Sequence, residues 1–345
     1  MTFLARREGV TASTVASFYN YQNSTLGTNF PQVNGQEVLA LLPTWHSLFL
    51  TLDNATYSVG VDASTISNYE QTFSIRDGIV STAFTWTPAT GSNESAIRLN
   101  YTALAHRSRP SLGLVRLTAS NLPSGAQVII TDAIDGAGAL RTDNQSSGSF
   151  DGGLVWSSVS PFNVTDNVAW LYSALDLGNS TNLDERIEAP ASVTAVLNTT
   201  SNATVSQSFS VAVPSSGELV LTKYVGIASG LAYAPNENST ARTTAGTARR
   251  DGWDSLVAEH RAEWESIWTN GGDIVFHADK NETRRLQQSV RASLFHLLAN
   301  VRDGKEGKGL GDNSIAPAGL TSDSYAGAIC EQSLHSLFSS LHTAH

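Results

Sequence analysis

The feature that most constrains the fold of this chain is a series of short stretches in which apolar and polar residues alternate, with turn-forming residues between them about every ten positions. In residues 97–103 every odd-numbered position is apolar and every even-numbered position is polar. Successive side chains of a strand point to opposite sides, so this spacing predicts a sheet with one buried face. The clearest strands are expected at residues 38–52, 97–106, 113–120, 205–213 and 218–227.

No helical pattern interrupts these strands, so we expect two antiparallel sheets packed face to face as a sandwich. The spacing changes near Asn238, and apolar residues between Trp253 and Ile267 then recur at helical intervals on one face. This pattern predicts an amphipathic helix that packs on another part of the molecule. A second helix is expected to follow, because Asp279 and Glu282 have the spacing of an N-cap and its capping-box partner.

Composition limits the class of protein. The chain has 345 residues, 41% of them hydrophobic, which suffices for one large all-β domain or for two domains. Its net charge of −10 argues against nucleic acid or an anionic membrane as a partner, because both require a basic face. Cys330 is the single cysteine, which excludes a disulfide framework and a cysteine-based metal site. No stretch has the length of a membrane span, and residues 1–10 lack the apolar core of a secretory signal.

The compartment is predicted from N-x-Ser/Thr sequons, the acceptors of N-linked glycans in secreted proteins. Eleven sequons are spread along the chain, which favours secretory passage over a Ser/Thr/Asn-rich surface that is never glycosylated. We therefore expect an acidic protein that is secreted to the cell wall or periplasm, or that is vacuolar. The sequon asparagines are Asn23, Asn54, Asn93, Asn100, Asn144, Asn163, Asn179, Asn198, Asn202, Asn238 and Asn281.

The common catalytic signatures are missing from the sequence. It contains no H-E-x-x-H, no G-x-S-x-G and no Cys/His cluster, so neither a metal nor a cofactor is expected. The Gly- and Lys-rich run at residues 304–312 has the wrong spacing for a phosphate loop and follows a helix instead of a strand. A solvated loop is the favoured interpretation of this run.

Paired carboxylates are the other candidate, because glycosidases use one carboxyl group as an acid and a second one as a base. Asp132 and Asp135 flank a Gly-rich loop, where Asp is usually a turn former, and that interpretation is favoured. The glutamates of the helix that starts at Trp253 are expected to form a solvated face with Arg261. These glutamates are Glu259, Glu263 and Glu265.

Histidines and tryptophans are assigned to the core. None of the eight histidines has metal-ligand spacing, and His260 and His296 lie on or beside apolar faces. Tryptophan in a β-rich domain more often packs in the core than it forms a sugar-stacking platform. The sequence leaves open which ring faces solvent among Trp45, Trp86, Trp156 and Trp170.

Several longer stretches carry a family pattern. The turn AGLTSDSYAG at residues 318–327 directly follows LGDNSIAP, and the helical run QQSVRASLFHLLANVR at residues 287–302 precedes both. Upstream lie GVDASTISNYEQTF at residues 60–73, FTWTP at residues 84–88 and HRAEWESIW at residues 260–268. Together these stretches resemble glycoside hydrolase family 65, and its fungal acid trehalase branch in particular. The resemblance covers nearly the whole chain up to Gly327 and stops there.

The resemblance implies a mainly β fold. This would be a large antiparallel super-sandwich of the galactose-mutarotase-like type, followed by a helical linker and the first helix of a truncated (α/α)6 barrel. The implied parts are a sandwich domain at residues 1–235 whose start is truncated, a linker at 236–280, the beginning of the barrel at 281–327 and an aberrant tail at 328–345. Without its barrel partners, the first barrel helix is expected to be exposed or frayed.

The same resemblance implies an enzyme that hydrolyses α,α-trehalose to glucose with inversion, using one Glu as general acid and another as general base. Neither Glu matches a residue of this chain, so no catalytic residue is assigned and the chain alone is expected to be inactive. Asp323 and Tyr325 match the family turn that leads into the active site, and they are the residues expected near a sugar. The alternative is that Asp323 caps a turn and Tyr325 packs beneath it.

Two other functions remain open. A disaccharide phosphorylase of the same family would use inorganic phosphate in place of water, although the sequons and the turn at residues 318–327 favour the hydrolase. A sandwich that binds carbohydrate or assembles with other proteins without catalysis is the third interpretation. The expected partner is a disaccharide, with no nucleic acid and no membrane insertion, and a homo-oligomer is left open.

Overall fold

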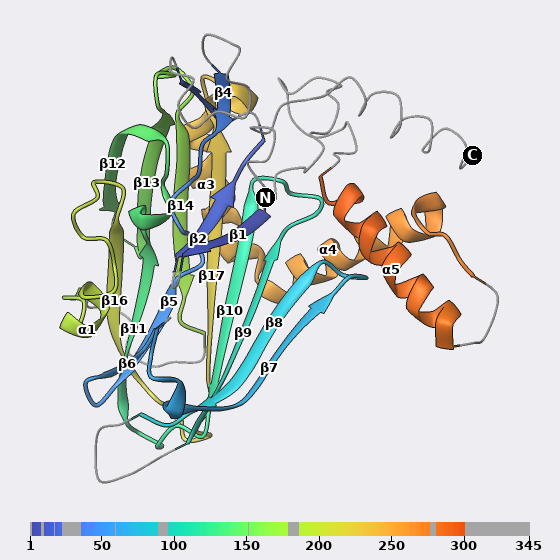
Figure 1. Cartoon of the computed structure of the whole chain (residues 1–345). Coiled ribbons are helices and arrows are strands. Elements are labelled where there is room, and N and C mark those ends of the chain that lie inside the picture. Colours follow the sequence, from blue (N-terminus) through green and yellow to red (C-terminus); the bar gives the residue numbers. More distant parts are fainter. Residues whose placement is uncertain are drawn as a thin grey trace.

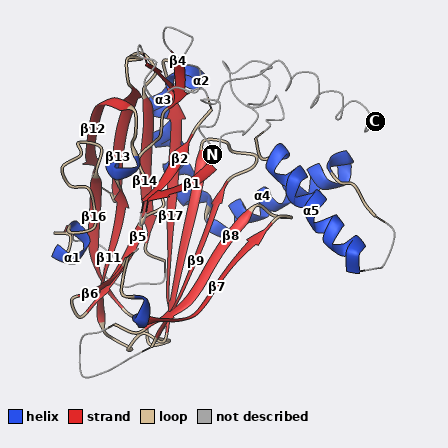
Figure 2. Cartoon of the chain, in the orientation of Figure 1, coloured by secondary structure: helices blue, strands red, loops and turns tan. Residues whose placement is uncertain are grey.

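The computed structural model describes residues 2–7, 10–16, 18–22, 36–58, 60–88, 96–150, 152–178, 186–276 and 281–300. Strands fill the body of the molecule, and the longer helices lie outside the sheets (Figure 1, Figure 2). The architecture confirms the predicted mainly β sandwich. No helix in the described ranges is long and apolar enough to cross a membrane.

The two large sheets are antiparallel throughout. The eight-stranded sheet has the order β12 (Thr142–Phe150), β13 (Leu154–Pro161), β14 (Ala169–Asp176), β17 (Leu219–Ser229), β10 (Leu112–Ser120), β9 (Ile97–Ala105), β8 (Ile79–Trp86) and β7 (Ile66–Ser74). The five-stranded sheet has the order β15 (Arg186–Ile187), β16 (Val205–Ala212), β11 (Gln127–Ile134), β5 (Leu48–Leu52) and β6 (Ala55–Tyr57).

Two small hairpins and several short helices complete the sandwich. The hairpins pair β1 (Thr2–Arg7) with β2 (Val10–Thr14) and β3 (Tyr19–Gln22) with β4 (Gln36–Leu39). The short helices are η1 (Ala63–Thr65), η2 (Gly136–Gly138), α1 (Ala191–Thr194) and α2 (Gly230–Tyr233).

Four of the five clearest predicted strands are confirmed, as β9, β10, β16 and β17. The expected single strand at residues 38–52 was wrong, because this stretch forms β4 and β5 with an irregular segment between them. Pro43 in that segment has no backbone N–H for a sheet ladder. Its neighbours pair elsewhere, since the N–H of Leu42 donates to the carbonyl of Ser13 and that of Thr44 to the carbonyl of Asp135.

The main core lies between the two sheets. Trp86, Leu99 and Ile130 belong to one cluster of buried side chains there, and Trp45, Val115 and Ile227 belong to a second. The alternation in β9 is visible in the burial of its first residues, because Ile97 and Leu99 are buried whereas Arg98 is exposed. One face of the eight-stranded sheet is therefore the inner face predicted from the sequence.

Helices cover part of the other, outer face of this sheet. After α2 come α3 (Glu237–Asp251) and α4 (Trp253–Ile267), whose buried side chains pack with outer-face residues of β10, β14 and β17. Helix α3 approaches closely because its contact residues are small: Ala241, Ala245 and Ala248. A Cβ at Gly226 of β17 would overlap the carbonyl oxygen of Ala241, so glycine is required at this contact. Helix α4 leads across the sheet towards the β7–β8 side (Figure 1).

Candidate functional site

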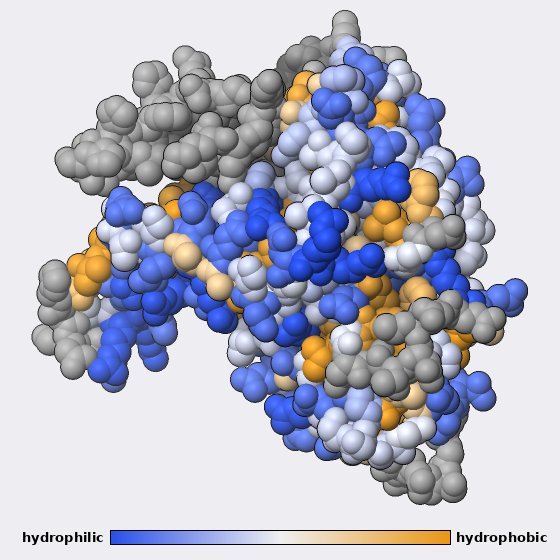
Figure 3. Space-filling model, turned by 180° about the vertical axis from the view of Figure 1, so that it is seen from behind, coloured by the Kyte–Doolittle hydropathy of each residue, from blue (hydrophilic) through white to orange (hydrophobic). Residues whose placement is uncertain are grey.

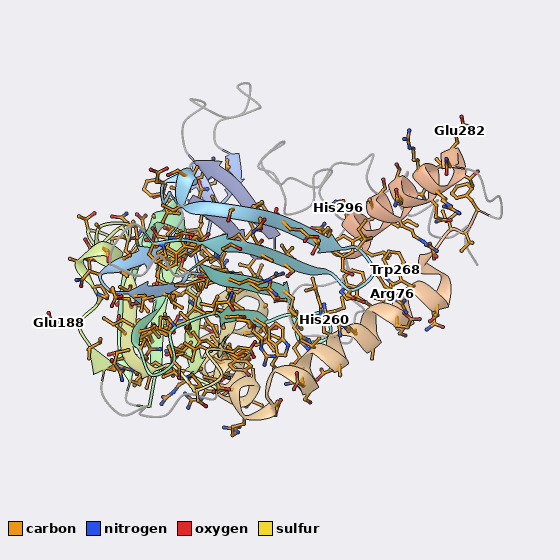
Figure 4. All side chains as sticks on the ribbon, turned by 90° about the horizontal axis from the view of Figure 1, so that it is seen from below. Arg76, Glu188, His260, Trp268, Glu282 and His296 are labelled. Carbon is orange, nitrogen blue, oxygen red and sulfur yellow. The ribbon has the colours of Figure 1, made fainter. Side chains whose placement is uncertain are left out.

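The functional candidate that the described residues build is a junction where the β7–β8 turn meets α4 and α5 (Asn281–Leu298). We call it the sheet–helix junction. Figure 4 shows Arg76, His260 and Trp268 close together there, whereas Glu188 lies at the other end of the molecule and Glu282 at the tip of α5. The indole N–H of Trp268, in the short helix η3 (Trp268–Gly272), donates to the carbonyl of Arg76 at 2.9 Å.

Two buried histidines fasten α4 to the sheet. Nδ1 of His260 accepts the N–H of Arg107 at 3.0 Å, so the proton is on Nε2, which donates to the carbonyl of Asp77. His106 has the same tautomer, because its Nδ1 accepts the N–H of Arg109 at 3.2 Å and its Nε2 donates to the carbonyl of Leu256 at 2.8 Å. Burial lowers the pKa of His260 to about 4 and also lowers the pKa of His106. Both rings are therefore neutral, hydrogen-bonded parts of the interior, as the sequence predicted for His260.

Two carboxylates of α4, Glu259 and Glu265, are paired with arginines on the turns that join β9 to β10 and β7 to β8. Arg109 contacts both oxygens of Glu259, with Nη2 to Oε2 at 2.6 Å, and its Nη1 reaches Asp251 at 2.6 Å. The Arg109 hydrogen bonds hold the pKa of Glu259 below its usual value. Arg76 pairs with Glu265 at 2.7 Å. Glu265 is exposed, as predicted, although its ion partner is Arg76 and not Arg261. The predicted solvated face was wrong for Glu259, which is half-buried and held by Arg109.

Helix α5 contacts the junction mainly through one ring. Phe295 is buried, stacks on Trp264 with ring centroids 4.9 Å apart and meets Phe73 edge to face at 4.9 Å. The rest of its apolar stripe is exposed or half-buried: Leu286 is 49% and Leu297 40% exposed, whereas Val290, Leu294 and Leu298 are half-buried. The expected exposure of this helix is therefore confirmed in part. His296 is also exposed, so its predicted core packing was wrong. Its neighbour Phe295 is the α5 residue that stacks on Trp264.

The segment between η3 and α5 shares this exposure. Gln287 bonds the backbone of Ile274 and Phe276, and Arg291 pairs with Asp273 at 2.6 Å, so the segment runs alongside α5. Its apolar side chains are nevertheless open, with Ile274 54% exposed. Hydrophobic atoms are visible on this projecting part in Figure 3.

The carboxylate pair considered from the sequence has a structural role. Asp132 is fully buried inside the sandwich, where its Oδ1 lies 2.6 Å from Nζ of the equally buried Lys223 and its Oδ2 accepts from Ser173 and Gln207. Asp135 instead caps η2, accepting the N–H of Ala137 at 2.9 Å. The favoured interpretation as a turn former is confirmed for Asp135 and was wrong for Asp132, which lies within β11. Neither carboxylate is arranged as a general acid or base.

Lys223, the partner of Asp132, was not predicted from the sequence, although a signal for it exists. Lys223 has the same parity in β17 as Leu221 and Val225, which face the inside of the sandwich. A lysine at an inward position requires a buried acceptor. Its Nζ also donates to the carbonyls of Ser47 and Ala133, at 3.1 and 2.7 Å.

The four tryptophans considered from the sequence divide into two pairs. Trp45 and Trp86 are buried between the sheets, which confirms the predicted core packing for both. Trp156 and Trp170 are only partly buried and lie on the outer face of β13 and β14. Successive residues of a strand face opposite sides of the sheet. Leu171 faces the inside of the sandwich, so its neighbour Trp170 lies on the outer face.

The remaining predicted sites divide between described and undescribed residues. Asp323, Tyr325 and three sequons, at Asn23, Asn93 and Asn179, lie outside the described residues. No sequon asparagine in the described ranges is buried: Asn100 and Asn198 are partly exposed, and the exposed ones are Asn54, Asn144, Asn163, Asn202, Asn238 and Asn281.

The described part of the chain holds no group of three or more His, Cys, Asp or Glu residues that could bind a metal ion. The sheet–helix junction therefore offers anchoring contacts, with its main carboxylates neutralised by arginines.

Comparisons with known proteins place this geometry in a family. The sequence model of the N-terminal domain of glycosyl hydrolase family 65 matches residues 4–267, which run through the sandwich, α3 and α4. One curated relative is the cell wall acid trehalase of Arthroderma benhamiae, which is 28% identical over an alignment that covers 92% of this chain and 31% of the relative. A second is the cell wall acid trehalase ATC1 of Candida albicans, which is 30% identical over 91% of this chain and 28% of the relative. The periplasmic acid trehalase ATC1 of Saccharomyces cerevisiae is 28% identical over 91% of this chain and 26% of its own length.

A solved structure shows the same fold. The protein described as "Putative kojibiose phosphorylase from human microbiome" superposes with a TM-score of 0.69 and 14% sequence identity, over 92% of this chain and 38% of that one. The chain spans about a third or less of the length of the curated relatives. On the family match over residues 4–267, this chain belongs to glycosyl hydrolase family 65 and carries its N-terminal domain.

Proposed function

We propose that this chain is the non-catalytic sandwich part of a secreted, inverting α,α-trehalose hydrolase. Its relatives are named acid trehalases and several are named as cell wall or periplasmic proteins, which agrees with the location predicted from the sequons. Trehalose is accordingly the proposed substrate of the whole protein, and residues 1–327 of this chain contribute its sandwich and the first barrel helix.

The observation that carries this proposal is the sheet–helix junction. The sandwich, α3 and α4 form one packed body, whereas α5 fully buries only Phe295 of its apolar stripe and leaves Leu286 and Leu297 exposed. A helix with an open stripe requires further apolar partners to be stably packed. The proposed role of this chain is therefore to anchor the first helix of a catalytic barrel. We expect the chain alone to be inactive, because no residue of it matches the general acid or general base that the family resemblance implies.

The test is an assay of the purified 345-residue chain with trehalose, with and without inorganic phosphate. The expected result is no glucose and no glucose 1-phosphate above the level of a heat-denatured control. Glucose release that does not need phosphate would overturn the inactivity of this chain. Formation of glucose 1-phosphate would replace the hydrolase by the phosphorylase alternative. Saturable binding of trehalose without turnover would instead identify a carbohydrate-binding module.

A further inference from the structure

The outer face of the eight-stranded sheet carries four aromatic side chains near its β12 edge: Phe150, Trp156, Trp170 and Tyr172. We call them the aromatic patch. The ring centroids of Trp156 and Trp170 are 5.1 Å apart, and Tyr172 lies 6.3 Å from both Trp170 and Phe150 in stacked arrangements. These side chains come from three adjacent strands. Tyr172 is buried, at 2% exposed, so the accessible surface of the patch is formed by Phe150, Trp156 and Trp170.

The strand register explains how the Trp156 indole can lie over the neighbouring edge strand. Trp156 lies directly opposite Tyr172 on one side and Gly148 on the other. A Cβ at Gly148 would come within 2.9 Å of the Trp156 indole, so the glycine allows the indole to lie over the edge strand. Trp156 and Trp170 stay partly exposed and Phe150 is 37% exposed. A group of accessible aromatic side chains such as Phe150, Trp156 and Trp170 often marks a binding surface.

Helix α3 places a sequon beside this patch. Asn238, in the sequence Asn238-Ser239-Thr240, is exposed, and its Oδ1 accepts the hydroxyl of Tyr172 at 2.7 Å. One turn later the guanidinium of Arg242 lies 4.4 Å from the centre of the Phe150 ring. In the described ranges, Asn238 is the sequon asparagine whose side chain is hydrogen-bonded to an aromatic side chain. The bond occupies its oxygen and leaves Nδ2, the atom that carries an N-linked glycan, at the border of the patch.

We infer that an N-linked glycan on Asn238 folds back and covers the aromatic patch. The attachment replaces one N–H of the side-chain amide by a bond from Nδ2 to C1 of the first sugar, and it displaces the pyrophosphate of a lipid-linked oligosaccharide donor, which leaves with the proton. A pyranose ring has a face of C–H groups that packs on aromatic rings, while its hydroxyl groups remain in water. The carbohydrate is thus the chain's own glycan, and this inference rests on the secretory location proposed above.

The test compares three variants of the chain produced through the secretory pathway of a yeast host. Thr240→Ala removes the sequon but keeps Asn238, and Thr240→Ser keeps the sequon. Alanine is a better helix former than threonine, so loss of stability in Thr240→Ala cannot come from helix propensity. Thr283→Ala is the control at a distant site, because it removes only the sequon at Asn281 on α5.

Two measurements are made on each variant: glycan occupancy at each sequon by peptide mass spectrometry, and hydroxyl-radical labelling of Phe150, Trp156 and Trp170. We expect Asn238 to be occupied in the parent chain, and we expect Thr240→Ala to raise labelling of the patch about twofold or more, since covered rings become open to solvent. Thr240→Ser and Thr283→Ala should leave this labelling at the parent level. Digestion of the parent with an endoglycosidase under native conditions should raise it as Thr240→Ala does.

The outcomes separate this inference from the proposed location. If no sequon is occupied, the secretory location fails and the glycan inference fails with it. If other sequons are occupied but Asn238 is not, or if Thr240→Ala leaves the labelling unchanged, the inference alone is overturned. It is also overturned if soluble β-glucan protects the rings of the glycosylated parent, because the patch would then be open to an external polysaccharide.

Discussion

Gly113 of β10 faces the ring of Trp45 inside the sandwich. A Cβ at this position would lie 2.6 Å from the ring, which is fully buried. We predict that Gly113→Ala lowers the free energy of unfolding by about 1–3 kcal/mol through overpacking, measured by urea denaturation. The matched control is Gly246→Ala on α3, where a Cβ has nothing within 4 Å. It should stabilise the chain by about 0.5–1 kcal/mol, and equal effects of the two variants would contradict this account.

The ion pair between Asp132 and Lys223 is a second contact whose contribution can be tested with single residues. Both side chains are 0% exposed, so Asp132→Asn leaves a buried cation without its counter-charge. The expected loss is about 3–5 kcal/mol in the free energy of unfolding. The double variant Asp132→Leu, Lys223→Met should recover part of this loss. Asp254→Asn serves as the control, because Asp254 is 97% exposed and 3.9 Å from Arg116, and its loss should stay within about 0.5 kcal/mol.

At the scale of elements, the attachment of α4 to the sheet depends on two neutral histidines. In the unfolded chain a histidine takes up a proton near pH 6.5, whereas His260 resists protonation down to about pH 4 because it is buried. The stability from this group is complete above about pH 6.5 and is lost as the pH falls towards 4. His106, whose pKa is also lowered by burial, acts in the same direction.

The prediction is that the free energy of unfolding falls between pH 7.5 and pH 5, by up to about 1.4 kcal/mol per pH unit for each such histidine. His260→Gln should make this dependence shallower, because the amide does not titrate. His46, whose pKa is lowered to about 4 by burial and by Lys223, keeps a residual slope in that variant. An identical slope in His260→Gln and the parent would disprove the assignment.

At the scale of the whole molecule, the outer helices and the sandwich share one core. Leu256 of α4 and Ala241 of α3 are fully buried against the outer face of the eight-stranded sheet, where Tyr224 and Leu114 would otherwise be open. The domain match also runs through both helices, to residue 267. The sequence-based boundary at residue 235 lies between the last strand and helix α3. It therefore assigns to two different parts residues of the strands and helices that are buried against one another.

We predict that a chain ending at residue 272 folds with a cooperative thermal transition, whereas a chain ending at residue 235 does not. The shorter chain would expose the apolar surface under α3 and α4 and should bind a hydrophobic dye strongly at room temperature. Circular dichroism melting and dye fluorescence measure both effects. A cooperative transition of the 235-residue chain at the same temperature would show that the helices are dispensable.

The sequence by itself determined the class of fold and the positions of most strands, because alternation at a period of two follows from strand geometry alone. It also identified α4 from helical spacing and Asp135 as a turn former, which are local properties. Only the tertiary structure decided which residues meet across the chain. Glu259 was assigned to solvent because its partner, Arg109, is 150 residues away, and Asp132 could not be distinguished from a turn residue without Lys223 opposite it. The aromatic patch required the register of three strands and the position of α3, since the distance between Tyr172 and Asn238 depends on long-range packing and not on either residue's neighbours.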